Sequence, residues 1–273
     1  MSMKSVMMTV GFCVLSAGLA VAQSAIDRAD FRAEAKALGA GLTATAMSPS
    51  PAPGGADTDS FGRNVQFDGL LQSGTVYLQA DCTPDPSNPL GPDDRCVTLT
   101  AAPSPTSFDL PNIGRLTIPG HSAHSLLCHW LTPIAYYGFQ NTTGSTATAN
   151  FRLAPYVIVQ SSVLSDPSLI DPTTGNPFNG QLITGFAATY QDSQSLDPGQ
   201  TAFRRFSETR VCIGGFLSKQ NLIQGYGLTE AQANQFFRHD ITLQFGLQGN
   251  AAMVGSTNPP SAYVIYGLRV VGD

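Results

Sequence analysis

Three of the four histidines of this chain lie close together, in the segment PGHSAHSLLCHW. Imidazoles at such short spacing could bind zinc or copper, so His121, His124 and His129 are the candidate metal ligands. On an extended strand, His121 and His129 would share one face and His124 would point to the other. No aspartate or glutamate lies nearby to orient a ligand, and the spacing matches no zinc motif. Ordinary strand and turn histidines are therefore the favoured interpretation.

The same segment contains a serine in a sequence close to a nucleophile elbow. Residues 120–124 read GHSAH, so His124 replaces the second glycine of G-x-S-x-G, and no helix is predicted to follow. Both departures disfavour Ser122 as a nucleophile. Glycoside hydrolysis usually needs two placed carboxylates, and Glu208 is the only glutamate among the predicted strands. The sequence therefore gives no specific sign of either catalytic machinery.

Oxygen-rich loops offer a second kind of candidate metal site. The best stretch supplies oxygen ligands at Asp171, Thr173 and Asn176, which are the candidate calcium ligands. It departs from the EF-hand pattern, because Gly175 is misplaced and the twelfth position is Leu182 instead of glutamate. The sequence predicts no required cofactor, with zinc or calcium as the alternatives.

The cysteines are better suited to structure than to chemistry. Cys13 lies in an apolar N-terminal stretch, and Cys82, Cys96, Cys128 and Cys212 lie beyond it. No C-x-x-C is present and exported cysteines usually oxidise, which favours disulfides over a metal or redox site. Of the three pairings that four cysteines allow, we expect Cys82 with Cys96, which bracket a proline-rich loop, and Cys128 with Cys212, which lie in predicted strands.

The first 22 residues have the layout of a signal peptide. Lys4 gives a positive start, an apolar run follows, and Ala20-Val21-Ala22 places small residues before Gln23. The run of about 15 residues is shorter than the roughly 20 that a membrane-spanning helix needs. We expect an exported protein, periplasmic, cell-surface or extracellular, with no transmembrane segment after signal cleavage.

Composition excludes some partners and favours one fold class. The net charge of −5 and pI near 5.2 give no electrostatic footprint for nucleic acid. Charged residues make up only 12% of the chain, and 27 glycines and 19 prolines provide many turns. Around ten short strand-like segments favour an antiparallel β-sandwich or jelly roll.

The chain divides into four predicted parts. A signal peptide (1–22) is followed by an N-terminal helical arm (23–46), a flexible Pro/Gly-rich linker (47–64) and a β-sandwich domain (65–273). The arm contains a short helix over residues 26–38.

Within the β domain, several local features are expected. A hairpin-like turn is predicted at residues 72–74, and Pro155 is predicted to separate two strands. A small helical insertion is predicted near residues 218–239. Ser218 can cap its first turn, and Thr229 with Gln232 fits a capping box for its second helix. Asn141-Thr142-Thr143 also matches the N-glycosylation sequon, which matters for a eukaryotic source.

The favoured function is a non-catalytic binding or structural/assembly role, because ionisable residues are few and form no coherent site. The partner would be a protein or a carbohydrate, and self-assembly through the arm is a further expectation. Aromatic residues such as Tyr136, Tyr137, Phe139 and Tyr156 could serve such a partner, although strand packing is their simpler interpretation. The alternative is a secreted hydrolase, metal-assisted, with its site around the segment from His121 to His129.

Overall fold

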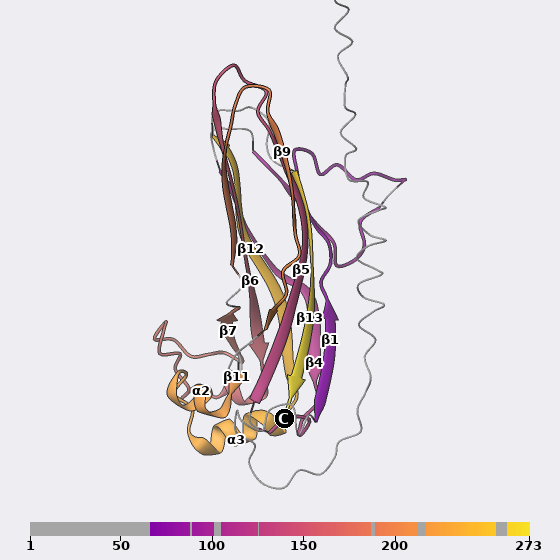
Figure 1. The fold of residues 1–273 in the computed structure, drawn as a ribbon. Helices are drawn as coiled ribbons and strands as arrows, with labels where there is room; N and C mark the ends of the chain where they lie inside the picture. The colour runs from indigo at the N-terminus through magenta and orange to yellow at the C-terminus, as the bar shows by residue number, and fades with distance from the viewer. Residues whose placement is uncertain are drawn as a thin grey trace, which may run out of the picture.

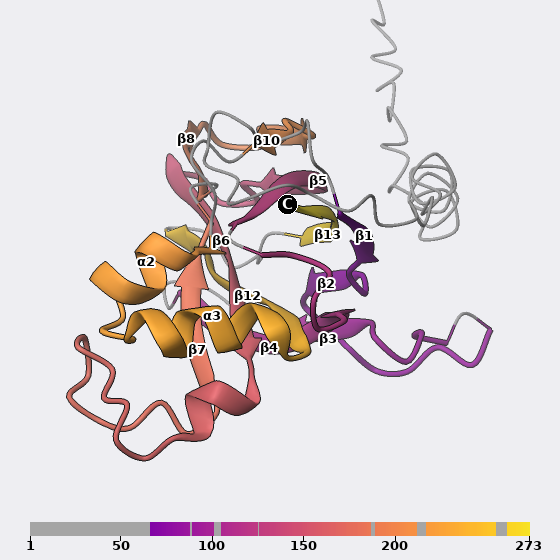
Figure 2. The ribbon, with the colours of Figure 1, turned by 90° about the horizontal axis from the view of Figure 1, so that it is seen from below.

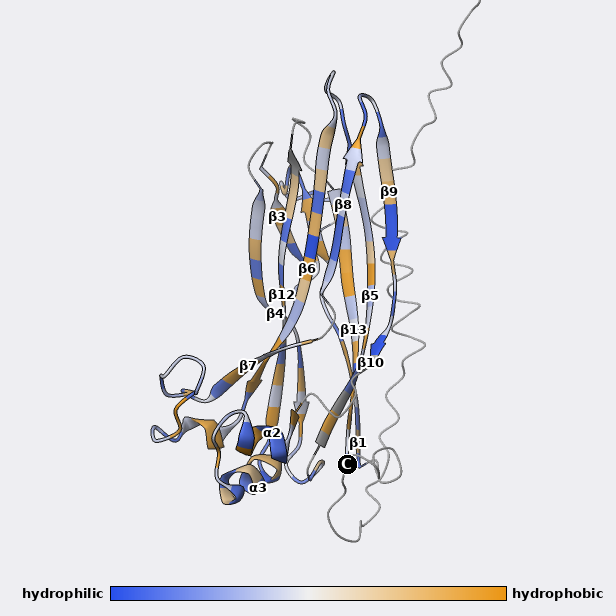
Figure 3. Cartoon of the chain, turned by 60° about the vertical axis from the view of Figure 1, so that its left-hand side comes forward, coloured by the Kyte–Doolittle hydropathy of each residue, from blue (hydrophilic) through white to orange (hydrophobic). Residues whose placement is uncertain are grey.

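Strands with alternating buried and exposed side chains make up most of the molecule. The computed structural model describes residues 66–273 except 88, 101–104, 125, 187–188, 212–216 and 255–260, and leaves out the side chains at 126, 128, 211, 253 and 254. Along β6 (Ala147–Gln160), every second residue from Ala147 to Leu153 is buried. Figure 3 shows this alternation of hydrophobic and hydrophilic residues along the long strands, the period of two that buries one face of a sheet. The predicted signal peptide, arm and linker lie outside the described residues.

Two sheets pack face to face, as predicted for a β-sandwich (Figure 1). The first sheet contains β1 (Phe67–Gln72), β2 (Val76–Gln79), β3 (Arg95–Thr98), β5 (Leu126–Gln140), β9 (Thr201–Phe206), β10 (Arg210–Val211), β11 (Leu217–Ser218) and β13 (Ser261–Gly272). The second contains β4 (Thr106–Ile118), β6, β7 (Gln181–Gly185), β8 (Tyr190–Leu196) and β12 (Ile241–Val254). The pairings among these strands are antiparallel, apart from β2 with β3.

The order of the strands is that of a jelly roll. In the first sheet, β1 and β2 share one edge of β13, and β9, β10 and β11 share the far edge of β5. In the second sheet, β4, β12 and β6 are neighbours, and β7 and β8 share the far edge of β6. We count strands that share an edge as one position and number the positions 1 to 8 along the chain. The spatial order is then 1-8-3-6 in the first sheet and 2-7-4-5 in the second. Consecutive positions therefore lie in different sheets, except positions 4 and 5, which are neighbours in the second sheet, as in a jelly roll.

The inward faces of both sheets share one hydrophobic core. Phe245 of β12 packs on Tyr266 of β13 with ring centroids 5.3 Å apart. Tyr137 of β5 stacks on Phe151 of β6 at 4.6 Å. All four side chains are at most 2% exposed. Because each pair joins one sheet to the other, these rings hold the two layers together.

Two short helices close one end of the sandwich beside the second sheet (Figures 1 and 2). They are α2 (Lys219–Gln224) and α3 (Glu230–Arg238), near the 3-10 turn η1 (Ser162–Ser165). The predicted caps are confirmed: the Ser218 side chain accepts a hydrogen bond from the Asn221 N–H, and Thr229 and Gln232 form the capping box. Each cap satisfies backbone donors that the first turn leaves unpaired.

The hairpin predicted at residues 72–74 is wrong. β1 and β2 do not pair with each other, because both pair with β13. The backbone N–H of Ser73 donates to the Tyr266 carbonyl, and its Oγ accepts from the Tyr266 N–H. The N–H of Gly74 donates to the Ile113 carbonyl of β4. Residues 73 and 74 thus bond to β13 and β4, and the chain does not reverse its direction between β1 and β2. Gly74 marks an irregularity between these two strands instead of a hairpin turn.

The strand break predicted at Pro155 is also wrong, because β6 continues through it. Pro155 lies where the outer neighbour of β6 changes: the pairing with β8 ends at Leu153, and the pairing with β7 begins at Tyr156. A proline has no N–H to donate, so a gap between two partner strands accommodates it.

A disulfide joins Cys82 to Cys96, as predicted. The end of the loop that it closes is fixed by Asp94, whose carboxylate accepts hydrogen bonds from the N–H groups of Thr75 and Gly91, both at 2.8 Å. The predicted pairing of Cys128 with Cys212 lies outside the described residues. Within the described part of the chain, no helix has the length and apolar character that crossing a membrane requires.

Candidate functional site

The three candidate histidines lie in and next to the connection between β4 and β5. His121 and His124 are exposed there, where the N–H of His121 donates to the Phe237 carbonyl. His121 has a φ of 64° and so belongs to a turn instead of an extended strand. His129 lies inside the sandwich at 5% exposure, with its ring centroid 4.6 Å from that of Phe186. The structure therefore separates the buried histidine from the two exposed ones.

Other groups near this segment are held in separate places. Asp240 accepts a hydrogen bond from the Gly120 N–H at 2.8 Å, and Glu208 is ion-paired with Arg210 at the surface. Over the described ranges, no three His, Cys, Asp or Glu side chains lie close enough together to hold a metal ion. Burial lowers the pKa of His129 to about 4, so its ring is neutral at pH 7. The histidines and carboxylates of the described residues do not converge on one place, and the metal site and the hydrolase stay predictions.

The candidate calcium ligands lie in a loop whose carboxylate is already engaged. Asp171 Oδ1 accepts from the Thr173 N–H at 2.8 Å, and its Oδ2 accepts from the Thr174 hydroxyl at 3.1 Å. The Asp171 N–H donates to the Asn176 carbonyl. These bonds are those of an aspartate that starts a turn, and the calcium site stays a prediction.

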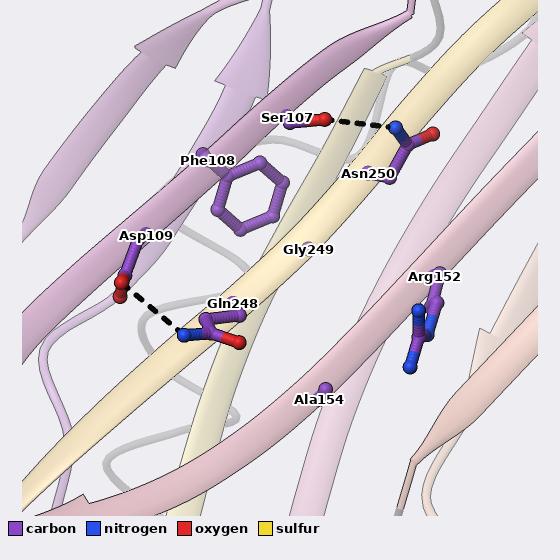
Figure 4. Close-up of a pocket in the computed structure, with 8 residues that line it drawn as sticks. All are labelled: Ser107, Phe108, Asp109, Arg152, Ala154, Gln248, Gly249 and Asn250. Carbon is purple, nitrogen blue, oxygen red and sulfur yellow. Dashed lines mark hydrogen bonds between the residues drawn. The ribbon is translucent and has the colours of Figure 1, made fainter. Parts of the chain in front are cut away.

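A hollow of about 460 Å³ lies on the outer face of the second sheet. Figure 4 shows that its residues come from three adjacent strands, β4, β12 and β6. Alternation explains the direction of the polar ones: Leu153 and Leu247 point into the core, so Arg152 and Gln248 next to them point outward. The lining consists of Ser107, Phe108, Asp109, Arg152, Ala154, Gln248, Gly249 and Asn250.

Hydrogen bonds between neighbouring strands fix the polar side chains of this hollow. Gln248 Nε2 donates to Asp109 Oδ2 at 3.2 Å, and Asn250 Nδ2 donates to Ser107 Oγ at 3.1 Å. In both pairs the register of β12 against β4 places the two residues directly opposite each other. Each amide is thereby oriented with its oxygen away from β4, toward the side of Arg152 (Figure 4). The hollow thus presents pre-oriented acceptors.

Tyr156 supports this arrangement from the edge of the hollow. Its hydroxyl donates to Asp109 Oδ1 at 2.6 Å. Burial and this bond to a carboxylate raise the pKa of Tyr156 above its ordinary value, so it stays a donor. Its ring occupies the space beside Gly246, where a Cβ would lie 2.3 Å from a ring atom. Both oxygens of Asp109 are therefore held by neighbours.

Arg152 supplies donors on the other side of the hollow. Its side chain is exposed, and none of the hydrogen bonds or ion pairs within the described residues involves its guanidinium. A guanidinium carries five N–H donors in one plane. Donors from Arg152 and acceptors from Gln248 and Asn250 therefore face the same hollow.

Of the four aromatic candidates, two are not available to a partner. Tyr137 and Phe139 are 2% and 1% exposed and belong to the core. Tyr156 lies at the hollow, and Tyr136 lies on the outer face of the first sheet. Asn141 of the sequon is fully buried, and its amide donates to the carbonyls of Ser145 and Leu196, so it is inaccessible in the folded protein.

Fold and site together define a jelly-roll β-sandwich with a polar hollow on one outer face. No protein-family model matches the chain, and no curated protein matches it. Two solved structures of infectious bursal disease virus were found, each 10% identical in sequence. The Gx strain structure covers 69% of this chain and 40% of its own, with a TM-score of 0.17. The T13 particle structure covers 82% and 60%, with a TM-score of 0.11. Such scores support no shared fold or function.

Proposed function

We propose that this chain is an exported binding protein that holds a glycan, without chemically changing it, in the hollow formed by β4, β12 and β6. The observation that carries the proposal is the set of pre-oriented polar side chains in Figure 4. Two amides, one hydroxyl, one carboxylate and one guanidinium line a single open site. The lining contains both donors and acceptors, fixed on rigid strands.

The chemistry of sugars explains why such a lining suits them. Every sugar hydroxyl both donates and accepts hydrogen bonds, so it pairs well with planar amides and carboxylates that are already oriented. Arg152 adds donors for a ring oxygen or for the carboxylate of an acidic sugar. An open position on a sheet face admits part of a longer chain, which a closed cavity would exclude.

The lining also favours binding over hydrolysis. Glycoside hydrolysis generally uses two carboxylates on either side of the scissile bond. Asp109 is the single carboxylate among the lining residues, and both of its oxygens already accept hydrogen bonds from Tyr156 and Gln248. This geometry suits a fixed acceptor.

Export is supported by two independent features. Residues 1–22 have the composition and order of a signal peptide. The Cys82–Cys96 disulfide indicates an oxidising compartment. Glycans of the cell envelope or surroundings would be accessible to a protein located there.

The test is a binding titration of the purified protein against two sets of oligosaccharides, one neutral and one containing uronic acids. Gln248→Ala and Arg152→Gln each remove a group from the hollow. Gln244→Ala and Arg115→Gln are matched controls, because both residues lie on the same outer face but outside the hollow.

We expect saturable binding of at least one set, weakened about tenfold by each hollow variant, the equivalent of about 1.4 kcal/mol. The control variants should bind as the unmodified protein does. Absence of binding to both sets, or equal losses in hollow and control variants, would overturn the proposal.

A further inference from the structure

The two sides of the hollow on the second sheet carry opposite charges. In the register of the strands, Gln248 of β12 lies opposite Asp109 of β4, and Asn250 of β12 lies opposite Arg152 of β6. Among the lining residues, Asp109 is the single carboxylate and Arg152 is the single guanidinium. Two strand spacings, about 10 Å, separate β4 from β6. The hollow therefore has a negative side along β4 and a positive side along β6 (Figure 4).

The guanidinium on the positive side forms no ion pair with the described residues. The charged residues in the five strands of this sheet are Asp109, Arg115, Arg152 and Asp192. Asp192 is turned toward the core, where it accepts a hydrogen bond from the Tyr137 hydroxyl at 2.7 Å. The residues opposite Arg152 on its two neighbouring strands are Asn250 and Gln191, which are both neutral. The exposed guanidinium of Arg152 is thus available to a ligand.

The carboxylate on the negative side is fixed by its neighbours. Asp109 Oδ1 accepts a hydrogen bond from the Tyr156 hydroxyl, and its Oδ2 accepts one from Gln248 Nε2. An ionised carboxylate held in this place repels a second one, because two like charges within one hollow are less than a screening length of about 10 Å apart. An anionic group of a ligand is therefore favoured beside β6 and disfavoured beside β4.

We infer that the ligand of this hollow is an acidic glycan whose uronate carboxylate pairs with Arg152. The inference rests on the proposed glycan binding and adds the class of sugar. A guanidinium has five N–H donors and no acceptor, so its partner must supply oxygen acceptors. The two oxygens of a planar carboxylate accept parallel hydrogen bonds from it and balance its charge. A neutral sugar hydroxyl offers one oxygen and no counter-charge.

The two amides of the hollow suit the rest of an acidic sugar. The side-chain nitrogens of Gln248 and Asn250 already donate toward β4, and their oxygens point to the side of Arg152 (Figure 4). These oxygens can accept hydrogen bonds from the ring hydroxyls that a uronate carries beside its carboxylate. The orientation of the sugar follows, with its carboxylate over β6 and its hydroxyls over β12.

The charge of the hollow favours a carboxylate over a phosphate. A phosphate monoester carries nearly two negative charges at pH 7 and is best paired by a cluster of cationic side chains. The lining supplies a single guanidinium, with the opposing charge of Asp109 across β12. One carboxylate balances this one positive charge.

A titration with matched oligosaccharides tests the assignment. The probes are short oligomers of galacturonate and of mannuronate, each compared with the same oligomer after reduction of its carboxylates to alcohols. Reduction removes the charge and leaves the ring hydroxyls in place. We expect the unmodified protein to bind at least one uronate oligomer about tenfold more tightly than its reduced form.

Three variants locate the origin of this preference. Arg152→Gln should abolish it, because the new side chain carries no charge. Arg115→Gln is the matched control: it removes an arginine from the same outer face outside the hollow, and it should keep both the affinity and the preference. Gln248→Ala should weaken the uronate and reduced forms alike, because it removes an acceptor for ring hydroxyls.

The outcomes separate this inference from the proposed function. Equal binding of the uronate and reduced forms would overturn the inference and leave glycan binding intact, whereas binding of neither form would overturn the proposed function itself. A preference that persists in Arg152→Gln, or that is lost equally in Arg115→Gln, would also overturn the inference. Tighter binding of a sulfated neutral oligomer than of either uronate would do so too, because it would assign the site to sulfate esters.

Discussion

The buried histidine of β5 makes the stability of this protein depend on pH in a defined window. His129 is 5% exposed and packs against Phe186 between the sheets. Loss of hydration on burial disfavours the imidazolium and lowers the pKa from 6.5 to about 4. Because the unfolded chain takes up this proton first, stability is fully present above about pH 6.5 and is lost as the pH falls toward 4.

The size of this effect follows from the two pKa values. Below pH 4 the full loss is about 3 kcal/mol, at about 1.4 kcal/mol for each pH unit that separates them. Between pH 7.5 and pH 5, the same linkage gives a loss of about 2 kcal/mol from this one side chain.

Urea unfolding of the unmodified protein and of His129→Gln at both pH values isolates this contribution. The variant is expected to be less stable at pH 7.5, but its free energy of unfolding should fall by about 2 kcal/mol less on going to pH 5. Carboxylates titrate in both proteins and cancel in the comparison. His239→Gln, which removes an exposed histidine, should behave as the unmodified protein does. An unchanged acid sensitivity in His129→Gln, or an NMR titration of His129 near pH 6.5, would refute the reasoning.

Three further changes test the fold by urea unfolding. Gly74→Ala would place a Cβ 1.8 Å from the Asp93 carbonyl oxygen and should lower the free energy of unfolding by about 3 kcal/mol. Gly144→Ala is the control and should be nearly neutral, because no atom lies within 4 Å of its Cβ. Equal effects of the two variants would contradict the close approach at Gly74. Cys82→Ala/Cys96→Ala should lose about 3 kcal/mol of loop-closure stabilisation, and a loss under 1 kcal/mol would contradict it. Asn141→Ala removes four hydrogen bonds of a buried amide and should lose about 3 kcal/mol. Asn150→Ala, which removes one bond at the surface, should lose less than about 1 kcal/mol; a similar loss in both would count against that role.

The sequence predicted the features that depend on local chemistry. About ten short strand-like segments separated by Gly/Pro turns predicted a sandwich, and Thr229 with Gln232 predicted a helix start, because both signals are complete within a few neighbouring residues. The Cys82–Cys96 disulfide was predictable from the short loop between them. The prediction of a hairpin at residues 72–74 is wrong because residues 73 and 74 bond to β13 and β4, which are distant in sequence.

The hollow could not be predicted from local patterns. Its polar residues come from strands that are separated by up to about 140 positions, and their meeting depends on the register of β12 against β4 and β6. Individually, Gln248 and Asn250 are ordinary exposed strand residues. His121, His124 and His129 were candidates because they are close in sequence. In the structure, the turn and the strand place them in separate environments.

The central claim is that the outer face of the second sheet binds a glycan at its hollow. Backbone amide NMR spectra, recorded as an oligosaccharide is added, test it most directly because they locate the site without any mutation. The account predicts saturable shifts concentrated at residues 107–109, 152–154 and 248–250, with the first sheet unaffected. Shifts centred on another face, or none for either neutral or uronate oligosaccharides, would contradict it.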